Sequence, residues 1–148
     1  MHPTDRFMSL ATDHSSGTST LLANGSPLPE RFDGLILEGQ YELPDGCTLV
    51  CLSDENIHDA GLHLHLVAAD GGIEDVMEGG GFLCPGYFQA RNLRDSSLDF
   101  RFFTNDRFYR VNVLQQSRFR FVLPTGWHYK HRLRPHRLTL TEFAKPHH

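Results

Sequence analysis

The chain has 148 residues, of which 39% are hydrophobic and 22% charged, and this length suits a single domain with its own core. No apolar run approaches the roughly 20 residues that cross a bilayer, which excludes a transmembrane helix, and we expect no membrane partner. The N-terminus also lacks the continuous apolar segment of a secretory signal, so we expect a cytoplasmic protein.

The net charge of −4 conceals a sharp division of charge along the chain. Residues 1–106 contain 5 Lys/Arg and 17 Asp/Glu and carry −12, whereas residues 107–148 contain 9 Lys/Arg and one Glu and carry +8. A division this sharp indicates that the acidic and basic regions take part in an electrostatic interaction. Basic strands lie beside acidic loops of the same chain, or the two regions form a dipolar surface for a partner, and both alternatives stay open.

Residues 1–30 have the composition of an arm. Most of the segment 12–29 is Ser, Thr, Gly, Asn and Pro, with only three leucines as apolar anchors. Such a segment cannot bury enough apolar surface to fold alone. We therefore expect a flexible N-terminal arm at 1–30, disordered or draped on a single β domain at 31–144, and a short tail at 145–148.

The first part of the domain consists of short segments with a strand pattern, separated by turns. The segment 47–52 is apolar on both faces except for Thr48, which predicts a strand covered on both sides and hence two layers. The segment 53–61 is the best candidate for a short helix. Strands are expected at 35–38, 40–43, 47–52, 61–67, 73–77 and 87–91.

The stretch 98–123 has the clearest strand pattern, because its apolar and polar residues alternate with a period of two. We predict a three-stranded antiparallel meander with an aromatic core face. Its turns lie at 104–107 and 115–117, and its third strand lies at 119–123. A last strand follows at 138–143.

A two-residue hairpin loop at Asn105-Asp106 would set the register of the first two strands of this meander. That register places Arg101 opposite Arg110, and like charges directly opposite each other are destabilising. Either Asp99 or another carboxylate bridges the two arginines, or the outer face binds an anion, or both arginines extend into water.

Turn signals recur every 8–12 residues through the domain, which is typical of sandwiches and barrels. The sequence therefore predicts an all-β fold, a two-layer antiparallel sandwich or flattened barrel with a C-terminal meander and at most one short helix. The three cysteines, Cys47, Cys51 and Cys84, are an odd number. Cys47 and Cys51 would lie roughly 13 Å apart on one strand, too far to bridge. Buried free thiols in a reducing cytosol are expected.

His63 and His65 form the one metal-like pair. Residues two apart on a strand point the same way, which puts the two imidazoles roughly 6.6 Å apart, a spacing that suits zinc or iron. Because Leu62, Leu64 and Leu66 face the core, the histidines are expected on the outer face, exposed or under a loop.

This region resembles part of a cupin, in which a His-x-His strand is followed by a carboxylate and a later Pro-Gly-x-x-His turn. Pro85-Gly86 supplies the turn, but Gln89 stands where the third histidine belongs, and Glu74 lies too far along the chain to be the carboxylate. The resemblance covers a small part of the chain and its defining ligands are missing, so the chain is not assigned to that family. It implies at most a metal-dependent, cupin-like small-molecule enzyme or binding barrel.

The segment 127–137 concentrates cations, histidines and aromatic rings, which is the chemistry of single-stranded nucleic-acid sites and of surfaces that meet acidic proteins. Alternatively, Trp127 and Leu133 fill the core while the charges pair with the acidic first part. The predicted partner-binding residues are Trp127, His128, Tyr129, Lys130, His131, Arg132, Arg134 and Arg137.

No motif of a phosphate loop, nucleophile elbow or common zinc site is present. Acidic side chains cluster at 54–59 and 74–78, and solvated loops explain both clusters. We therefore predict no catalytic residue and no cofactor, with zinc or iron at His63 and His65 as the exception.

The predicted function is non-catalytic binding of a macromolecular partner, in the first instance a protein, through the basic aromatic C-terminal surface. An inhibitor or immunity-type protein, or a self-associating homo-oligomeric subunit, fits this pattern. The alternatives are the cupin-like metal protein that uses His63 and His65, and single-stranded nucleic-acid binding.

Overall fold

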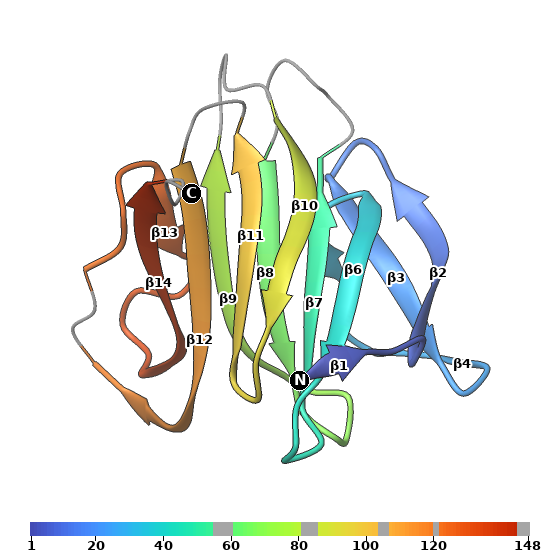
Figure 1. Ribbon diagram of the computed structural model, residues 1–148. Coiled ribbons are helices and arrows are strands. Elements are labelled where there is room, and N and C mark those ends of the chain that lie inside the picture. Colours follow the sequence, from blue (N-terminus) through green and yellow to red (C-terminus); the bar gives the residue numbers. More distant parts are fainter. Residues whose placement is uncertain (55–60, 81–85, 104–106, 120–121, 145–148) are drawn as a thin grey trace.

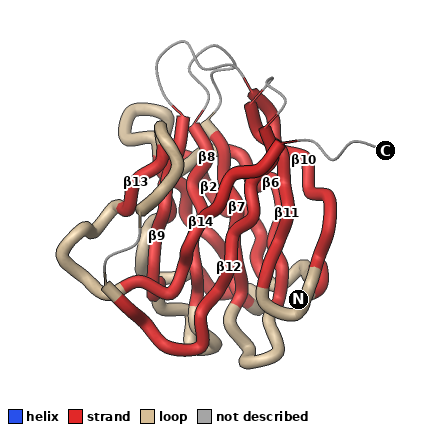
Figure 2. Tube along the Cα trace, turned by 60° about the vertical axis from the view of Figure 1, so that its left-hand side comes forward, coloured by secondary structure: helices blue, strands red, loops and turns tan. Residues whose placement is uncertain are grey.

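The computed structural model describes residues 1–54, 61–80, 86–103, 107–119 and 122–144. All regular elements among these residues are strands, and the strands pair antiparallel in three sheets (Figures 1 and 2). The predicted all-β sandwich class is therefore confirmed. No helix in the described ranges is long and apolar enough to cross a membrane. Most of the candidate helix, the centre of the 104–107 turn and the tail at 145–148 lie outside the described residues.

The central sheet has six strands in the order β1-β6-β7-β8-β9-β13. The segment 47–52 was predicted to be covered on both faces, and every residue of the corresponding strand is buried. Gly61–Val67 forms a strand over the same residues that the alternation predicted. The strands of this sheet are β1 (His2–Pro3), β6 (Ile36–Glu42), β7 (Thr48–Ser53), β8 (Gly61–Val67), β9 (Ile73–Gly80) and β13 (Trp127–Tyr129).

A four-stranded C-terminal sheet packs on one face of the central sheet and forms the main core with it. Leu64 and Met77 from the central sheet meet Phe100 and Val111 in this core, where all four side chains are fully buried. The strands of the C-terminal sheet are β10 (Gly86–Leu93), β11 (Ser97–Phe103), β12 (Arg107–Arg118) and β14 (His136–Ala144), in that order.

The register between β11 and β12 differs by two residues from the predicted one. Phe100 lies opposite Tyr109, so the aromatic face is kept, because a shift of two preserves the side of every side chain. The shift changes the charged pairs: Asp99, not Arg101, lies opposite Arg110. Asp99 accepts hydrogen bonds from Arg110 and also from Arg94, at 2.6 and 3.0 Å. The predicted clash of two arginines is therefore wrong, and its place is taken by an ion pair.

The third strand of the meander was predicted at 119–123, and this is wrong for the described residues of that segment. β12 ends at Arg118, and both Phe119 and Val122 are exposed, at 60% and 94%. The three consecutive strands of the meander are β10, β11 and β12, and β14 pairs with the free edge of β12. The chain forms β13 in the central sheet before it returns as β14.

Residues 1–30 contribute to a small N-terminal sheet that covers part of the other face of the central sheet (Figure 1). Phe7, Leu21 and Phe32 are buried there against Val50 and Leu52 of β7. The segment expected to be disordered or draped therefore forms strands, and the division of the chain at residue 30 stays a prediction. The strands of this sheet are β2 (Phe7–Asp13), β3 (Thr18–Ala23), β4 (Ser26–Pro27) and β5 (Phe32–Asp33).

Gly79 is the position where the backbone approaches a large side chain. It pairs with Trp127 across β9 and β13, and a Cβ atom on Gly79 would lie 2.3 Å from the indole ring. The missing side chain lets Trp127 lie flat on the sheet and reach Phe100 and Tyr109 in the main core.

We expect Gly79→Ala to lower the free energy of unfolding by about 1–3 kcal/mol, because the added methyl group overpacks the space that the indole fills. Urea unfolding followed by the fluorescence of the only tryptophan measures this change and reports any displacement of Trp127. The matched control is Gly72→Ala, whose Cβ would meet only the Asp70 carboxylate, at 3.2 Å. An equal loss of stability in both variants would contradict the prediction.

Candidate functional site

Charged side chains gather on the face of the central sheet that carries the N-terminal sheet. The strand registers place Leu52, His63, Glu78 and His128 in one row across β7, β8, β9 and β13. Adjacent residues in such a row lie on the same face and touch. His63 and His128 therefore flank Glu78, and β5 brings Asp33 to the same place from the N-terminal sheet.

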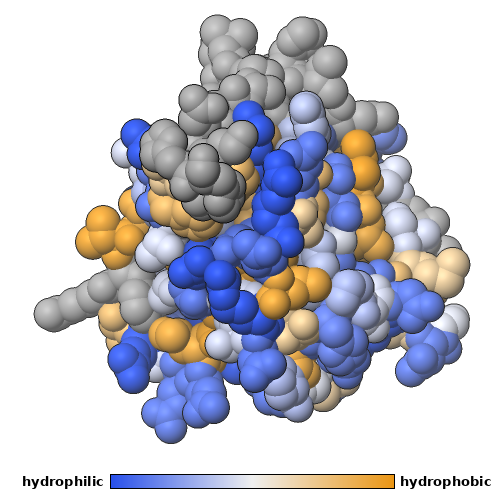
Figure 3. Space-filling model, viewed as in Figure 1, coloured by the Kyte–Doolittle hydropathy of each residue, from blue (hydrophilic) through white to orange (hydrophobic). Residues whose placement is uncertain are grey.

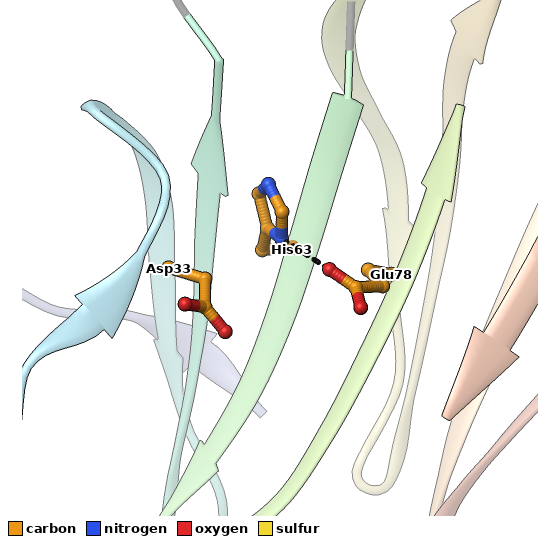
Figure 4. Close-up of side chains that lie close together, drawn as sticks. All are labelled: Asp33, His63 and Glu78. Carbon is orange, nitrogen blue, oxygen red and sulfur yellow. Dashed lines mark ion pairs between the residues drawn. The ribbon is translucent and has the colours of Figure 1, made fainter. Parts of the chain in front are cut away.

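His63 is the centre of this cluster (Figure 4). Its Nε2 lies 3.0 Å from Oδ1 of Asp54, and its Nδ1 lies 3.0 Å from Oε2 of Glu78. One ligand atom each of Asp33, His63 and Glu78 lie within 4.8 Å of one another. Lys130 donates a hydrogen bond of 2.6 Å to Asp33. We call Asp33, Asp54, His63 and Glu78 the acid–histidine cluster.

The carboxylates of this cluster shift the pKa of His63 strongly. Burial alone would lower that pKa, but hydrogen bonds and charges from Asp54 and Glu78 outweigh burial and raise it to about 9. The hydrogen bond from His63 in turn lowers the pKa of Glu78 to about 2, against the opposite effect of burial. Protonated His63 and ionised Glu78 therefore stabilise each other over the whole neutral pH range.

His65 has a different environment from His63, although both lie on the same face of β8. It is 1% exposed, its ring packs edge-on against Phe32, and its Nε2 lies 3.0 Å from the backbone oxygen of Asp33. Burial lowers the pKa of His65 to about 4, so the ring stays neutral. The two histidines were expected on the outer face, exposed or under a loop. The structure covers them with the N-terminal sheet, and it brings His63, not His65, together with Asp33 and Glu78.

The two aromatic residues of the basic segment belong to the core. Trp127 and Tyr129 are buried in the main core, and the hydroxyl of Tyr129 donates to the backbone oxygen of Leu138. Leu133, which the sequence offered as a second core residue, is instead 95% exposed. Of the two residues that the sequence suggested for the core, Trp127 is therefore correct and Leu133 is wrong.

Several cations of the basic segment pair with acids from the first part of the chain. Lys130 pairs with Asp33, and His128 pairs with Glu78 at 3.0 Å. Arg137 donates to Asp45 and to Glu74. The sequence left open whether the division of charge is satisfied inside the protein, and for these residues it is.

The remaining predicted partner-binding residues, His131, Arg132 and Arg134, lie in the connection between β13 and β14 and are exposed. In the described part of the chain they make no ion pair. They are the members of the predicted set that keep their charge for solvent or for a partner.

Sequence reasoning found part of the acid–histidine cluster. His63 was a candidate from its strand spacing, while Asp54 and Glu78 were taken for residues of solvated acidic loops. Glu78 instead lies within β9, where the register puts it beside His63. Asp33 was missed, because it has no neighbouring signal in the sequence and reaches the cluster only when β5 packs on the central sheet.

Comparison of the chain with protein-family models, with curated protein sequences and with solved structures gives no match.

We expect the stability contributed by His63 and His65 to be greatest near pH 6.5, the pKa of an unperturbed histidine. Between pH 6.5 and about 4 the unfolded chain protonates His65 but the folded chain does not, so stability falls as the pH falls. Between pH 6.5 and about 9 the folded chain keeps the proton on His63 that the unfolded chain has lost, so stability falls as the pH rises. These two losses form an acidic and an alkaline limb of the curve of stability against pH, and each limb amounts to at most about 3 kcal/mol.

Urea unfolding across pH 4–9, in EDTA so that only protons exchange with the site, measures both limbs. His65→Gln is expected to flatten the acidic limb and His63→Gln the alkaline limb. Limbs that stay unchanged in both variants would show that other groups cause the pH dependence.

Proposed function

We propose that the protein is a non-catalytic binding protein that contacts an acidic surface of a partner protein through an exposed basic region beside β13 and the C-terminal sheet. This region, which we call the basic tip, consists of the end of β12 and the two connections that flank β13. Its residues are Arg118, Phe119, Val122, His131, Arg132, Leu133 and Arg134.

The observation that supports the proposal best is the exposure of large apolar side chains among unpaired arginines. Leu133 is 95% exposed between Arg132 and Arg134, and Val122 is almost as exposed. Such side chains contribute nothing to the core in these positions. An apolar centre with arginine around it is the usual composition of a protein–protein interface.

The two parts of the basic tip lie close together because of one strand pair. Arg118, the last residue of β12, pairs with His136, the first residue of β14. Phe119 directly follows Arg118, and Leu133 lies three residues before His136. Figure 3 shows small hydrophobic patches interleaved with hydrophilic ones on the side of the molecule where these connections lie.

The positive charge of the basic tip favours a partner with an acidic surface. Lys130 and Arg137, the neighbouring cations in sequence, are already paired with internal carboxylates. The positive charge of Arg132 and Arg134 is not neutralised by described residues. A surface rich in Asp and Glu complements it, and such complementarity speeds and orients association.

A protein partner explains the basic tip better than a single-stranded nucleic acid does. Sites for single strands combine cations with several exposed rings on which bases stack. Trp127 and Tyr129, the rings that suggested such a site in the sequence, are buried in the core. Among the described residues of the basic tip, Phe119 is the exposed aromatic ring of a Phe, Tyr or Trp, and it offers a platform for one base.

The test replaces Leu133 by the photo-crosslinking residue p-benzoylphenylalanine in the cells that produce the protein. We expect one protein adduct, mapped by mass spectrometry to an Asp/Glu-rich surface, and loss of this adduct in an Arg132→Glu/Arg134→Glu background. The control places the same residue at Met8, which is also exposed but lies on β2, away from the basic tip.

The identity of the adduct separates the alternatives. An adduct with a second copy of this chain, together with a dimer in analytical ultracentrifugation, favours the self-associating version of the proposal. Equal adducts from positions 8 and 133, or none from position 133, would contradict it. Binding of a fluorescent single-stranded oligonucleotide at low salt, weakened in Arg132→Ala/Arg134→Ala, would favour the nucleic-acid alternative.

A further inference from the structure

We propose that Asp33, His63 and Glu78 bind one divalent transition-metal ion, which joins the N-terminal sheet to the central sheet. This inference is independent of the proposed function, because it uses a different part of the molecule from the basic tip. Each ligand comes from a different strand: Asp33 from β5, His63 from β8 and Glu78 from β9.

The His63 ring has the orientation of a metal ligand. The Nε2 atom faces the Asp54 carboxylate at 3.0 Å, so it carries the hydrogen and donates it there. A metal-binding histidine usually donates its second ring N–H to a carboxylate in this way, which fixes the ring and its tautomer. Asp54 therefore has the position of a residue that orients a ligand.

The other ring nitrogen of His63 faces Glu78. Nδ1 of His63 is buried, and Oε2 of Glu78 lies 3.0 Å away. With Nε2 donating to Asp54, these two atoms need a cation between them, and in the metal-free protein this cation is the second proton of the His63 ring. A metal ion that displaces this proton is bound by both atoms.

The distances within the cluster suit a single metal ion. Zinc binds nitrogen and oxygen at about 2.0–2.2 Å, so two ligand atoms of one tetrahedral ion lie about 3.4 Å apart. Nδ1 of His63 and Oε2 of Glu78 lie 3.0 Å apart, close to this spacing, and one ligand atom each of Asp33, His63 and Glu78 lie within 4.8 Å of one another. Asp33 is partly exposed on a two-residue strand, so its side chain has room to approach the other two ligands.

The charge of the cluster also suits a metal ion. Asp33, Asp54 and Glu78 place three carboxylates around one imidazole, and Lys130 is the cation that contacts Asp33. Imidazole and carboxylate without a thiolate suit zinc, iron and manganese. His128, half-exposed and 3.0 Å from Oε1 of Glu78, is available as a further nitrogen ligand.

The experiment is isothermal titration calorimetry of the full chain with Zn²⁺. The absorption spectrum of bound Co²⁺ reports the coordination geometry. We expect one ion per chain, a higher melting temperature, and slower hydrogen exchange in β2 and β3, because the ion joins their sheet to β8 and β9. His63→Gln and Glu78→Gln are expected to weaken binding by about tenfold or more. Lys130→Met is expected to tighten binding, because it removes the cation that competes for Asp33.

The matched control is His131→Gln, which removes an exposed histidine of the basic tip and is expected to bind as the wild type does. Absence of one-to-one binding at micromolar metal overturns the proposal. Binding that persists in both His63→Gln and Glu78→Gln, or that His131→Gln weakens equally, belongs to other histidines and overturns it too. If His63→Gln does not fold, the wild-type stoichiometry, the loss in Glu78→Gln and the gain in Lys130→Met decide.

Discussion

The central sheet is covered on both of its faces, and the rest of the structure depends on this constraint. Alternate residues of β7 belong to two different cores: Leu49 and Cys51 face the C-terminal sheet, whereas Val50 and Leu52 face the N-terminal sheet. Polar side chains on a covered face lose water and must find partners within the protein. His63 and His65 on the neighbouring strand are such side chains, and their opposite pKa shifts follow from the partners that each one finds.

Ion pairs between distant parts of the chain match the two halves of the charge division. Asp99 with Arg110, Asp33 with Lys130, and Glu74 with Arg137 each join the acidic first part to the basic second part. Partly exposed ion pairs contribute only about 0–1 kcal/mol each, so the apolar cores provide most of the stability. The pairs instead determine which face of each strand meets which neighbour. The basic tip is the region where this matching stops, and the surplus charge there is the basis for expecting a partner.

The sequence assigned two features to function, the pair of histidines at 63 and 65 and the segment 127–137. Part of the first feature belongs to the acid–histidine cluster, and part of the second belongs to the basic tip. His63 came from a strand spacing that suited a metal pair, yet the acidic side chains beside it come from β5 and β9, and His65 is not among the clustered residues. The segment 127–137 came from its composition, yet Trp127 and Tyr129 complete the core and only part of the segment remains outside. Composition and spacing singled out these two regions, while burial decided which of their side chains are exposed to solvent.

The sequence alone determined the properties that depend on neighbouring residues. The alternation with a period of two predicted β8 with its observed bounds, and the apolar residues on both faces of 47–52 predicted a sheet that is covered on both sides. The tertiary structure alone decided what depends on distant residues: that β14 pairs with β12, that Asp99 faces Arg110, and that Asp33 reaches His63. Alternation fixes the face of a side chain but not the partner or register of its strand, because shifts by two residues keep every apolar side chain on the same face.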